Sequence, residues 1–398
     1  MLIGLVGAPN VGKSTFFKSA TLAEALIANY PFATIKPNHG IGYVKIRCID
    51  KEFTPPRQCN PREGVCIDGW RFVPVEMLDV AGLVPGASEN KGLGNQFLDD
   101  LRQADAFIQI VDMSGQTNEE GKPTKEEYDP CKSIEFLIRE LDLWYAGILK
   151  KVWKVFARTT EMVKDNFAEA VAKQFSGLKV TEEDVKIVIR KTGYNPERPT
   201  TWNDEQLTNF AGMLRMITKP MIIAANKMDQ QKSEENLKRA IEKFPEYVII
   251  PCSAEGELML RMATKEGIIK YLPGEKNYEI ISEKINDKQK QALEFIKENV
   301  LEKYGSTGVQ EIINKVVLEM LKYIAIFPAG TKKLEDSKGN VLPDCYFLPE
   351  GSTALDFAYK LHTDLGDNFI KAIDVRTKQI IGKEHVLKHR DGIEIITR

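Results

Sequence analysis

Residues 7–14 read Gly-Ala-Pro-Asn-Val-Gly-Lys-Ser and directly follow an apolar run at residues 2–6. This is the pattern G-x-x-x-x-G-K-[ST], which lies between a buried strand and a helix and wraps backbone N–H groups around phosphate oxygens. Residues 15–27, which follow it, are suited to a helix. The pattern therefore fixes a strand, a turn and a helix start, and it predicts that the chain binds a nucleoside triphosphate.

Each part of this loop has an expected role. Gly7 and Gly12 let the backbone curl, Lys13 reaches the β- and γ-phosphate oxygens, and the Ser14 hydroxyl ligates Mg²⁺. We expect nucleotide contacts from the whole loop and the start of the helix, that is from Gly7, Ala8, Pro9, Asn10, Val11, Gly12, Lys13, Ser14 and Thr15.

The bulk composition narrows the class of protein. A chain of 398 residues exceeds one hydrophobic core, so two or three domains are expected. The 55 Lys and Arg residues nearly balance the 57 Asp and Glu residues, so no overall field favours DNA or a membrane as partner. The lack of a long apolar run and the low number of cysteines, six, indicate a cytoplasmic protein without a membrane span or cleaved leader.

Three of the cysteines, Cys48, Cys59 and Cys66, lie close together in the sequence without forming a Cys-x-x-Cys pair. Three interpretations stay open. A zinc site would need a fourth ligand, and His39 is the only histidine nearby; Cys59 and Cys66 would otherwise form a disulfide, or all three are ordinary thiols.

The order of apolar strands and amphipathic helices predicts the organisation of the chain. Strands at residues 72–78 and 106–111, with a turn-rich excursion at 51–69 before them, are typical of a parallel α/β sheet. Helical periodicity then dominates from Cys131 onward. We expect a phosphate-loop domain at residues 1–115 and 205–275, a helical insertion at 116–204, a helical connection at 276–321, and a small α+β domain of order ββαβ at 322–398.

Two further motifs complete a triphosphate site. Asp79 and Gly82 follow the strand at 72–78, where the carboxylate can hold Mg²⁺ through water and the Gly82 N–H can bond the γ-phosphate. Thr34, in a proline-bounded segment at 30–37, is the best candidate for a further Mg²⁺ ligand. Lys13, Thr34 and Gly82 are the expected catalytic groups.

The base is predicted from the segment after the strand at 221–225. There Asn226, Lys227 and Asp229 are placed so that the Asp229 carboxylate accepts bonds from guanine N1–H and N2–H₂ and the Lys227 stem covers the base. Adenine lacks both donors and would leave Asp229 unpaired, at a cost of about 1–3 kcal/mol. The next strand is followed by Ser253, Ala254 and Glu255, and the Ala254 N–H is expected to bond guanine O6. The predicted ligands are GTP and GDP.

These motifs resemble a known family. Residues 29–40, 79–88 and 91–95 resemble the Obg superfamily of GTPases, and the helical insertion and C-terminal domain resemble its YchF subfamily. The resemblance implies a Ras-like P-loop GTPase sheet, a coiled-coil arm, a β-grasp TGS domain at 322–398, and association with ribosomes or rRNA. YchF proteins typically carry glutamate in place of the base-reading aspartate and favour ATP. This chain keeps Asp229, so we predict that it prefers GTP.

The residue after Gly82 is Leu83, which cannot orient a water molecule as the glutamine of many GTPases does. We therefore predict slow intrinsic hydrolysis of GTP, in a translation-associated switch. Asn10 resembles the asparagine of GTPases that bind K⁺ beside the phosphates, which suggests K⁺ activation as a further hypothesis. The alternatives are a YchF-type ATPase and a nucleotide-binding scaffold with negligible hydrolysis.

The inserted helix carries Lys150, Lys154 and Arg158 on one face, which either meets rRNA phosphates or is an ordinary solvated surface. Trp144 and Trp153 on the same helix are expected to pack rather than to stack on bases. The oligomeric state stays open.

Overall fold

The computed structural model describes residues 1–21, 38–53, 57–80, 82, 101–124, 128–163, 166–331, 333–336 and 338–398. Contacts divide the chain into two compact units. The first unit comprises Met1–Ser19, Asn38–Gly40 and the described parts of Glu76–Ile312, and the second comprises, among described residues, Ala20, Thr21 and the described parts of Ile41–Val75 and Ile313–Arg398.

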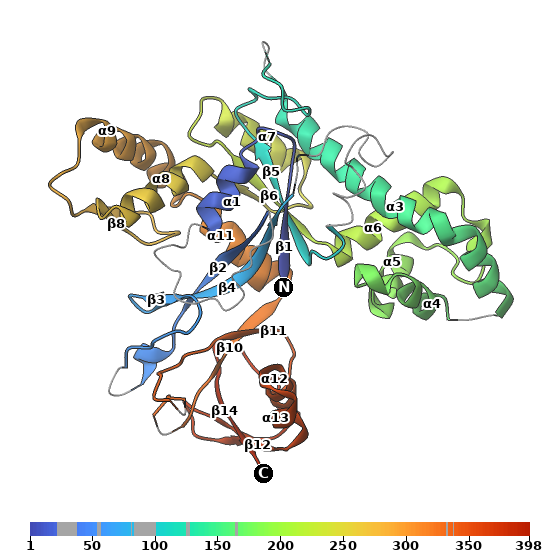
Figure 1. Ribbon diagram of the computed structural model, residues 1–398. Coiled ribbons are helices and arrows are strands. Elements are labelled where there is room, and N and C mark those ends of the chain that lie inside the picture. The colour runs from blue at the N-terminus through green and yellow to red at the C-terminus, as the bar shows by residue number, and fades with distance from the viewer. Residues whose placement is uncertain are drawn as a thin grey trace. The chain divides into compact units, whose positions relative to one another are not determined.

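A largely parallel sheet organises the first part of the chain (Figure 1). Its strands are ordered β2-β4-β1-β5-β6-β7, and the short strand β3 pairs antiparallel with β4. β1, β5 and β6 are buried along their whole length, as expected for parallel strands covered on both faces. The bounds are β1 Leu2–Val6, β2 His39–Arg47, β3 Val65–Ile67, β4 Trp70–Asp79, β5 Ala106–Asp112, β6 Met221–Asn226 and β7 Ile249–Pro251. The predicted α/β fold is confirmed.

Parallel pairing sets the position of the functional motifs. β1 pairs with β4 and β5, and β6 pairs with β5 and β7, all in parallel. The carboxyl ends of these strands therefore meet at one edge of the sheet, where ligands bind in open α/β sheets. The registers match Leu5 with Asp79 and Asp112 with Asn226 across neighbouring strands.

Short helices follow the strands of the sheet. They are α1 Lys13–Thr21, α7 Ser233–Lys243 and α8 Ala254–Lys265, and a small antiparallel pair, β8 Ile269–Tyr271 and β9 Tyr278–Ile280, comes next. The expected helical connection at 276–321 contains two helical segments, each with a π-helical turn. They comprise α9 Asp287–Ile296, a π-helix Lys297–Leu301, α10 Glu302–Tyr304, α11 Val309–Asn314 and a π-helix Lys315–Met320.

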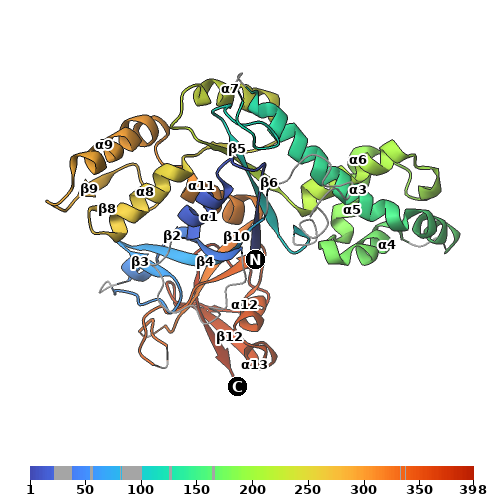
Figure 2. The same cartoon turned by 45° about the horizontal axis from the view of Figure 1, so that its top comes forward.

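The helical insertion is built on α3 Pro130–Val163, which begins one residue before the expected start. α3 lies beside α6 Asp204–Thr218, with α4 Phe167–Gln174 and α5 Glu182–Thr192 packed near its far end (Figures 1 and 2). α5 begins at a capping box, in which Thr181 Oγ1 accepts a bond from the Asp184 N–H at 3.2 Å.

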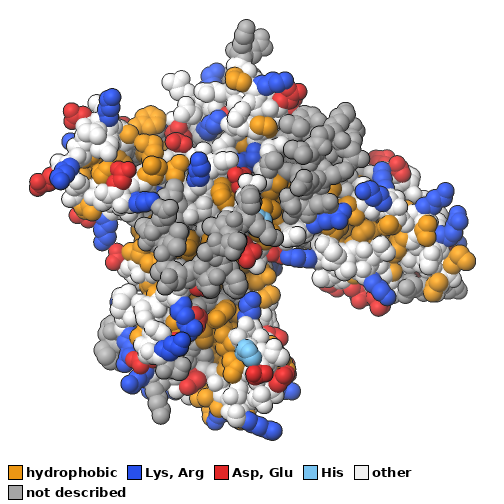
Figure 3. Space-filling view, viewed as in Figure 1, with side chains coloured by type: hydrophobic (Ala, Val, Ile, Leu, Met, Phe, Trp, Pro, Cys, Tyr) orange, Lys and Arg blue, Asp and Glu red, His pale blue; other side chains and the backbone are white. Residues whose placement is uncertain are grey.

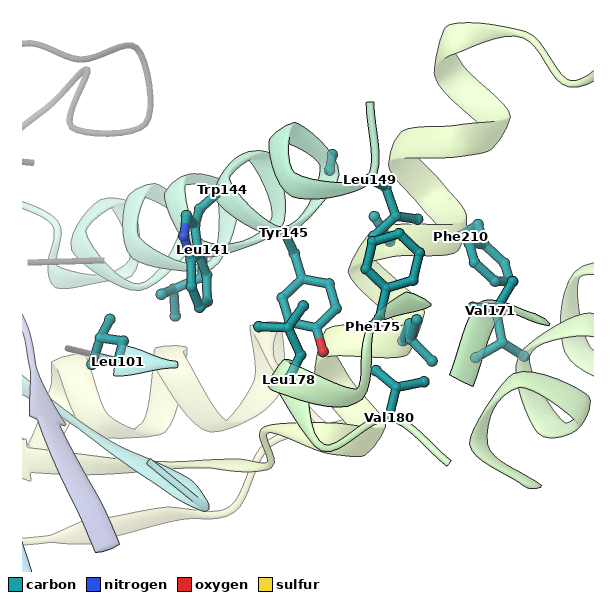
Figure 4. Close-up of a cluster of buried hydrophobic side chains, with 14 of the residues drawn as sticks. Leu101, Leu141, Trp144, Tyr145, Leu149, Val171, Phe175, Leu178, Val180 and Phe210 are labelled. Carbon is teal, nitrogen blue, oxygen red and sulfur yellow. The ribbon is translucent and has the colours of Figure 1, made fainter. Parts of the chain in front are cut away.

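Aromatic and aliphatic side chains together form the core of the insertion (Figure 4). Trp202 lies 5.1 Å from Phe210, 5.2 Å from Trp153 and 5.4 Å from Phe167 between ring centroids. The expectation that Trp144 and Trp153 pack is confirmed, because they are only 6% and 8% exposed. On the outer face, Lys150 forms an ion pair with Asp204 at 3.1 Å.

The second unit contains a five-stranded sheet in the order β11-β10-β14-β12-β13. Its first two strands in chain order, β10 and β11, pair antiparallel. The expected order ββαβ was too short: the order is ββααβββ, with bounds β10 Tyr323–Pro328, β11 Tyr346–Pro349, α12 Ala354–Leu361, α13 Thr363–Asp367, β12 Phe369–Asp374, β13 Ile380–Ile381 and β14 Gly392–Thr397. α13 follows α12 after one residue and β13 has two residues, so neither produces a separate periodic pattern.

Lys and Arg side chains and Asp and Glu side chains are both present on the face shown in Figure 3. This mixed surface agrees with the balanced composition. None of the helices in the described parts of the chain combines the length and apolar character needed to cross a membrane.

The aromatic core should carry much of the stability of the insertion. We predict that Phe210→Ala lowers its free energy of unfolding by about 3–5 kcal/mol, because Phe210 is fully buried and its removal leaves a cavity. The measurement is denaturant unfolding followed by tryptophan fluorescence. Val155→Ala is the control, since Val155 lies on α3 and is 74% exposed; an equal loss in both variants would contradict this account of the core.

Candidate nucleotide-binding site

The phosphate loop has a backbone that only glycine fits at two positions. Gly7 has φ +153°, and a Cβ there would lie 2.5 Å from the Ile110 carbonyl oxygen. Gly12 has φ +97°, and its Cβ would lie 2.3 Å from Asn226 Nδ2. The two glycines therefore permit both the turn and its close packing on β5 and β6.

Lys13 is the first residue of α1 and is 8% exposed. Its Nζ donates to the carbonyl oxygens of Gly7 at 3.1 Å and Ala8 at 2.7 Å, so the ammonium group lies within the loop. Burial lowers the pKa of Lys13 to about 8, with the Asp79 carboxylate acting in the opposite direction.

A hydroxyl and a carboxylate meet beside the loop. Ser14 Oγ donates to Asp79 Oδ2 at 3.1 Å, because parallel pairing of β1 and β4 brings the two motifs to one edge. Burial raises the pKa of Asp79, and a bound cation would offset that cost. This pair of hard oxygen donors fits Mg²⁺.

Of the other positions discussed near the phosphates, two belong to the described residues and two do not. Gly82 lies against the loop, since a Cβ on it would come within 2.9 Å of the Pro9 nitrogen. Thr15 is half-buried on α1. Thr34 and Leu83 lie outside the described residues.

Asn226, the first residue of the segment predicted to bind the base, connects the phosphate loop to the start of α8. Its Nδ2 donates to the Val11 carbonyl oxygen at 2.9 Å, and its Oδ1 accepts from the Ala254 N–H at 3.0 Å. The side chain is 3% exposed, so both bonds are sheltered from water. The Ala254 N–H, which was predicted to bond guanine O6, is thus occupied by Asn226 in this structure.

Asp229 is held by neutral donors on both oxygens. Ser253 Oγ donates to Oδ1 at 2.8 Å, and Gln230 Nε2 donates to Oδ2 at 2.7 Å. Ser253 also caps α8 by accepting from the Gly256 N–H at 3.2 Å. The carboxylate is therefore oriented by two donors, while Glu255, the third predicted residue of that segment, is exposed to solvent.

Sequence reasoning missed Asp112, at the end of β5. Asp112 Oδ2 pairs with Lys227 Nζ at 2.7 Å, and its Oδ1 accepts from the Ser114 N–H at 3.0 Å and hydroxyl at 2.5 Å. Lys227 has φ +64°, so this pair holds a residue in a conformation that lysine rarely adopts. The available signal was an acidic residue at the carboxyl end of a predicted strand.

Two supporting contacts were also missed. Asn10, itself at φ +62°, donates from Nδ2 to the Gly121 carbonyl oxygen at 2.9 Å. Behind the base-reading segment, the Ser253 N–H donates to the Thr307 carbonyl oxygen at 2.9 Å, and Gly308 packs so closely that a Cβ would lie 2.0 Å from the Pro251 carbonyl oxygen. Both contacts join segments far apart in sequence.

Comparisons with known proteins agree with this geometry. Residues 2–138 match the 50S ribosome-binding GTPase family, residues 224–330 match the G4 motif-containing domain of Obg-like, YGR210-like GTPases, and residues 328–397 match the TGS domain. An uncharacterized GTP-binding protein of Methanocaldococcus jannaschii is 50% identical over 398 residues, covering 100% of this chain and 99% of that one. Another, from Schizosaccharomyces pombe, is 34% identical and covers 89% of this chain and 88% of its own length.

Two solved structures resemble this chain over its whole length. The crystal structure of a GTP-binding protein from Pyrococcus horikoshii OT3 has a TM-score of 0.78 at 40% identity and covers 100% of both chains. The Schizosaccharomyces pombe YchF GTPase, at 21% identity and a TM-score of 0.58 over 100% of this chain and 97% of its own, shows the same fold. Fold and site together define a P-loop GTP-binding protein with a TGS domain. The chain belongs to the Obg-like, YchF-related family of GTP-binding proteins.

The buried Lys13 should couple nucleotide binding to pH. Because its pKa is about 8 in the free protein and phosphate oxygens raise it, GDP binding at about pH 8.5 should take up a proton, whereas at about pH 6.5 the lysine is already charged. The affinity for GDP should therefore fall as the pH rises past the pKa of Lys13 in the free protein, about 8. Calorimetry in buffers of different ionisation enthalpy measures the uptake. Lys13→Arg, charged throughout, should abolish it; equal uptake in both proteins would refute the role of Lys13.

Asp229 should determine the base. In Asp229→Asn the retained Oδ1 still accepts from Ser253, but one carboxylate acceptor becomes an N–H donor that matches the C2 carbonyl of xanthine rather than the N2–H₂ of guanine. We predict that GTP binding weakens about 10–100-fold and that XTP binding improves. Titration with fluorescent nucleotides measures both. Glu242→Gln, at an exposed position of α7, is the control, and an unchanged ratio of GTP to XTP affinity in Asp229→Asn would rule out this assignment.

Proposed function

We propose that this protein binds GTP and hydrolyses it to GDP and phosphate, and that it acts in the cytoplasm as a ribosome-associated molecular switch. The observation that carries the proposal is the Asn226 side chain, which joins the phosphate loop at Val11 to the base-reading segment at Ala254. One set of contacts thereby supports binding of the phosphates and of a guanine base.

The proposed chemistry is transfer of the γ-phosphoryl group to water. Lys13 and an Mg²⁺ ion, bound by Ser14 and Thr34 and through water by Asp79, would neutralise the charge on the β- and γ-phosphates, and the Gly82 N–H would bond a γ-phosphate oxygen. When the bond between the γ-phosphorus and the bridging oxygen breaks, GDP leaves. Leu83 supplies no group to orient the attacking water, so the intrinsic rate would be low.

Two observations support the ribosome as partner. Part of the chain matches a family described as 50S ribosome-binding GTPases. Relatives from Bacillus subtilis and Escherichia coli O157:H7 bear the name ribosome-binding ATPase YchF, at 28% identity over 98% and 27% over 95% of this chain. In this proposal ordering of the loops near Thr34 and Gly82 on the γ-phosphate signals to the helical insertion and the TGS domain.

The names of those relatives also favour a second candidate, a YchF-type ATPase. Against it stands Asp229, whose two oxygens are held by Ser253 and Gln230 and have no donor to meet on adenine. A third candidate, a scaffold with negligible hydrolysis, rests on Leu83.

Single-turnover hydrolysis of GTP, with and without ribosomes, tests the proposal. We expect slow hydrolysis by the protein alone and faster hydrolysis with ribosomes, together with co-sedimentation that is stronger in a GTP analogue than in GDP. Lys13→Ala should show neither hydrolysis of GTP nor stronger co-sedimentation in the GTP analogue. Absence of hydrolysis under both conditions would favour the scaffold.

Parallel reactions in KCl and NaCl test the K⁺ hypothesis. Equal rates of hydrolysis in the two salts would exclude activation at Asn10.

A further inference from the structure

Four side chains with metal-binding atoms converge in the second unit, and none of them belongs to a nucleotide motif. The ligand atoms of Cys48, Asp50, Cys59 and Cys66 all lie within 4.8 Å of one another. Cys48 follows β2, Asp50 begins a short 3-10 helix at Asp50–Glu52, and Cys66 lies in β3. The excursion between β2 and β3 thus folds back so that residues up to 18 positions apart meet at one point.

The cluster is buried and contains an unsatisfied charge. Cys48 and Cys59 are each 4% exposed, and Asp50 is fully buried. Asp50 Oδ2 accepts from the Cys59 N–H at 3.3 Å, whereas Oδ1 has no hydrogen-bond partner among the described residues. A buried carboxylate oxygen without a donor is costly unless a cation neutralises it. The three thiols beside it carry no positive charge, and the nearby Arg71 guanidinium donates to Cys59 and to backbone carbonyl oxygens rather than to Asp50 Oδ1.

We propose that Cys48, Asp50, Cys59 and Cys66 bind one Zn²⁺ ion. Three sulfur ligands favour zinc over the hard cations, which prefer oxygen, and four protein ligands complete a tetrahedral shell without an open position, as in structural zinc sites. Asp50 takes the place that the sequence analysis considered for His39. Binding releases the three thiol protons to solvent, because the ligands coordinate as thiolates.

A buried arginine supports the site from outside. Three thiolates, one carboxylate and Zn²⁺ sum to a charge of −2, and the Arg71 guanidinium, which is 1% exposed, offsets part of it. Arg71 Nη1 approaches Cys59 Sγ at 3.9 Å, a weak contact that suits a sulfur acceptor. The same guanidinium donates to the carbonyl oxygens of Leu342 at 3.1 Å and Pro343 at 2.9 Å. It therefore links the metal site to the C-terminal part of the unit.

The proposed ion would also order a surface used within this unit. The excursion contacts the C-terminal part of the unit through ion pairs, from Arg57 to Glu335 at 2.5 Å and from Arg62 to Asp336 at 3.1 Å. Glu52, two residues from Asp50, pairs with Arg376 at 2.7 Å and with Arg390. Zinc would thus hold the excursion in the shape that these contacts require, which is a structural role independent of nucleotide chemistry.

The test is the zinc content of the full-length protein purified without chelator, measured by elemental mass spectrometry. We expect about one zinc per chain, and Co²⁺ added to the stripped, reduced protein should give the absorption bands of tetrahedral thiolate coordination. Cys66→Ser, at a half-buried position, and Asp50→Asn should each lose most of the zinc. Cys131→Ala is the matched control, since Cys131 is a free thiol outside the cluster, and it should keep the full content.

Wild-type protein alone also decides the question, in case a variant fails to fold. Removal of zinc should lower the midpoint of thermal unfolding, and added Zn²⁺ should restore it. Absence of zinc from the purified protein, together with no uptake of Zn²⁺ or Co²⁺ by the reduced chain, would overturn the proposal. So would a count of four rather than six titratable thiols in the denatured, unreduced protein, because Cys48 and Cys59, whose sulfurs lie 3.6 Å apart, would then be a disulfide pair.

Discussion

The nucleotide site depends on one buried side chain, the carboxamide of Asn226. It donates to the backbone of the phosphate loop and accepts from the backbone at the start of α8. Two segments far apart in the sequence are thereby held at a fixed separation. A carboxamide is suited to this position because it offers a donor and an acceptor at opposite sides of one rigid plane. Gly12 makes the arrangement possible, since any larger residue would displace the Asn226 amide nitrogen.

The other contacts of the site extend from this connection. Lys227, next in the chain, is anchored by Asp112 at the end of the neighbouring strand, and Asp229 is oriented by the hydroxyl of Ser253. At the phosphate end, Lys13 and Ser14 are placed by a helix that begins where the loop ends. Parallel pairing of the strands supplies the frame, because it brings every one of these motifs to the same edge of the sheet.

Much of this arrangement was predictable because it is encoded locally. The glycines and the lysine of residues 7–14 dictate a turn between strand and helix, and Asn226 and Asp229 follow a recognisable apolar strand. The helical insertion was also predictable, since its apolar periodicity is long and its caps are strong. In each case a few neighbouring residues determine the backbone.

The contacts that could not be predicted from the sequence are those between segments far apart in the chain. The pairing of Asp112 with Lys227 joins residues 115 positions apart, and the bond from Asn10 to Gly121 spans 111. The fourth member of the cysteine cluster, Asp50, was overlooked because an aspartate in a turn-rich segment is ordinarily a solvated residue. Asp50 is buried only when the excursion is folded, and its burial beside three thiols makes its carboxylate a candidate metal ligand.

We propose that this site selects guanine through Asp229, in the segment that Asn226 connects to the phosphate loop. Competition of unlabelled nucleotides against a fluorescent GDP derivative, with Mg²⁺ present, tests it most directly. We expect GTP and GDP to compete at least about 100-fold more strongly than ATP and ADP, since guanine offers the Asp229 carboxylate two N–H donors and adenine offers it none. Equal competition by the two bases, or stronger competition by ATP, would contradict the account and place this chain with an adenine-binding branch of its family.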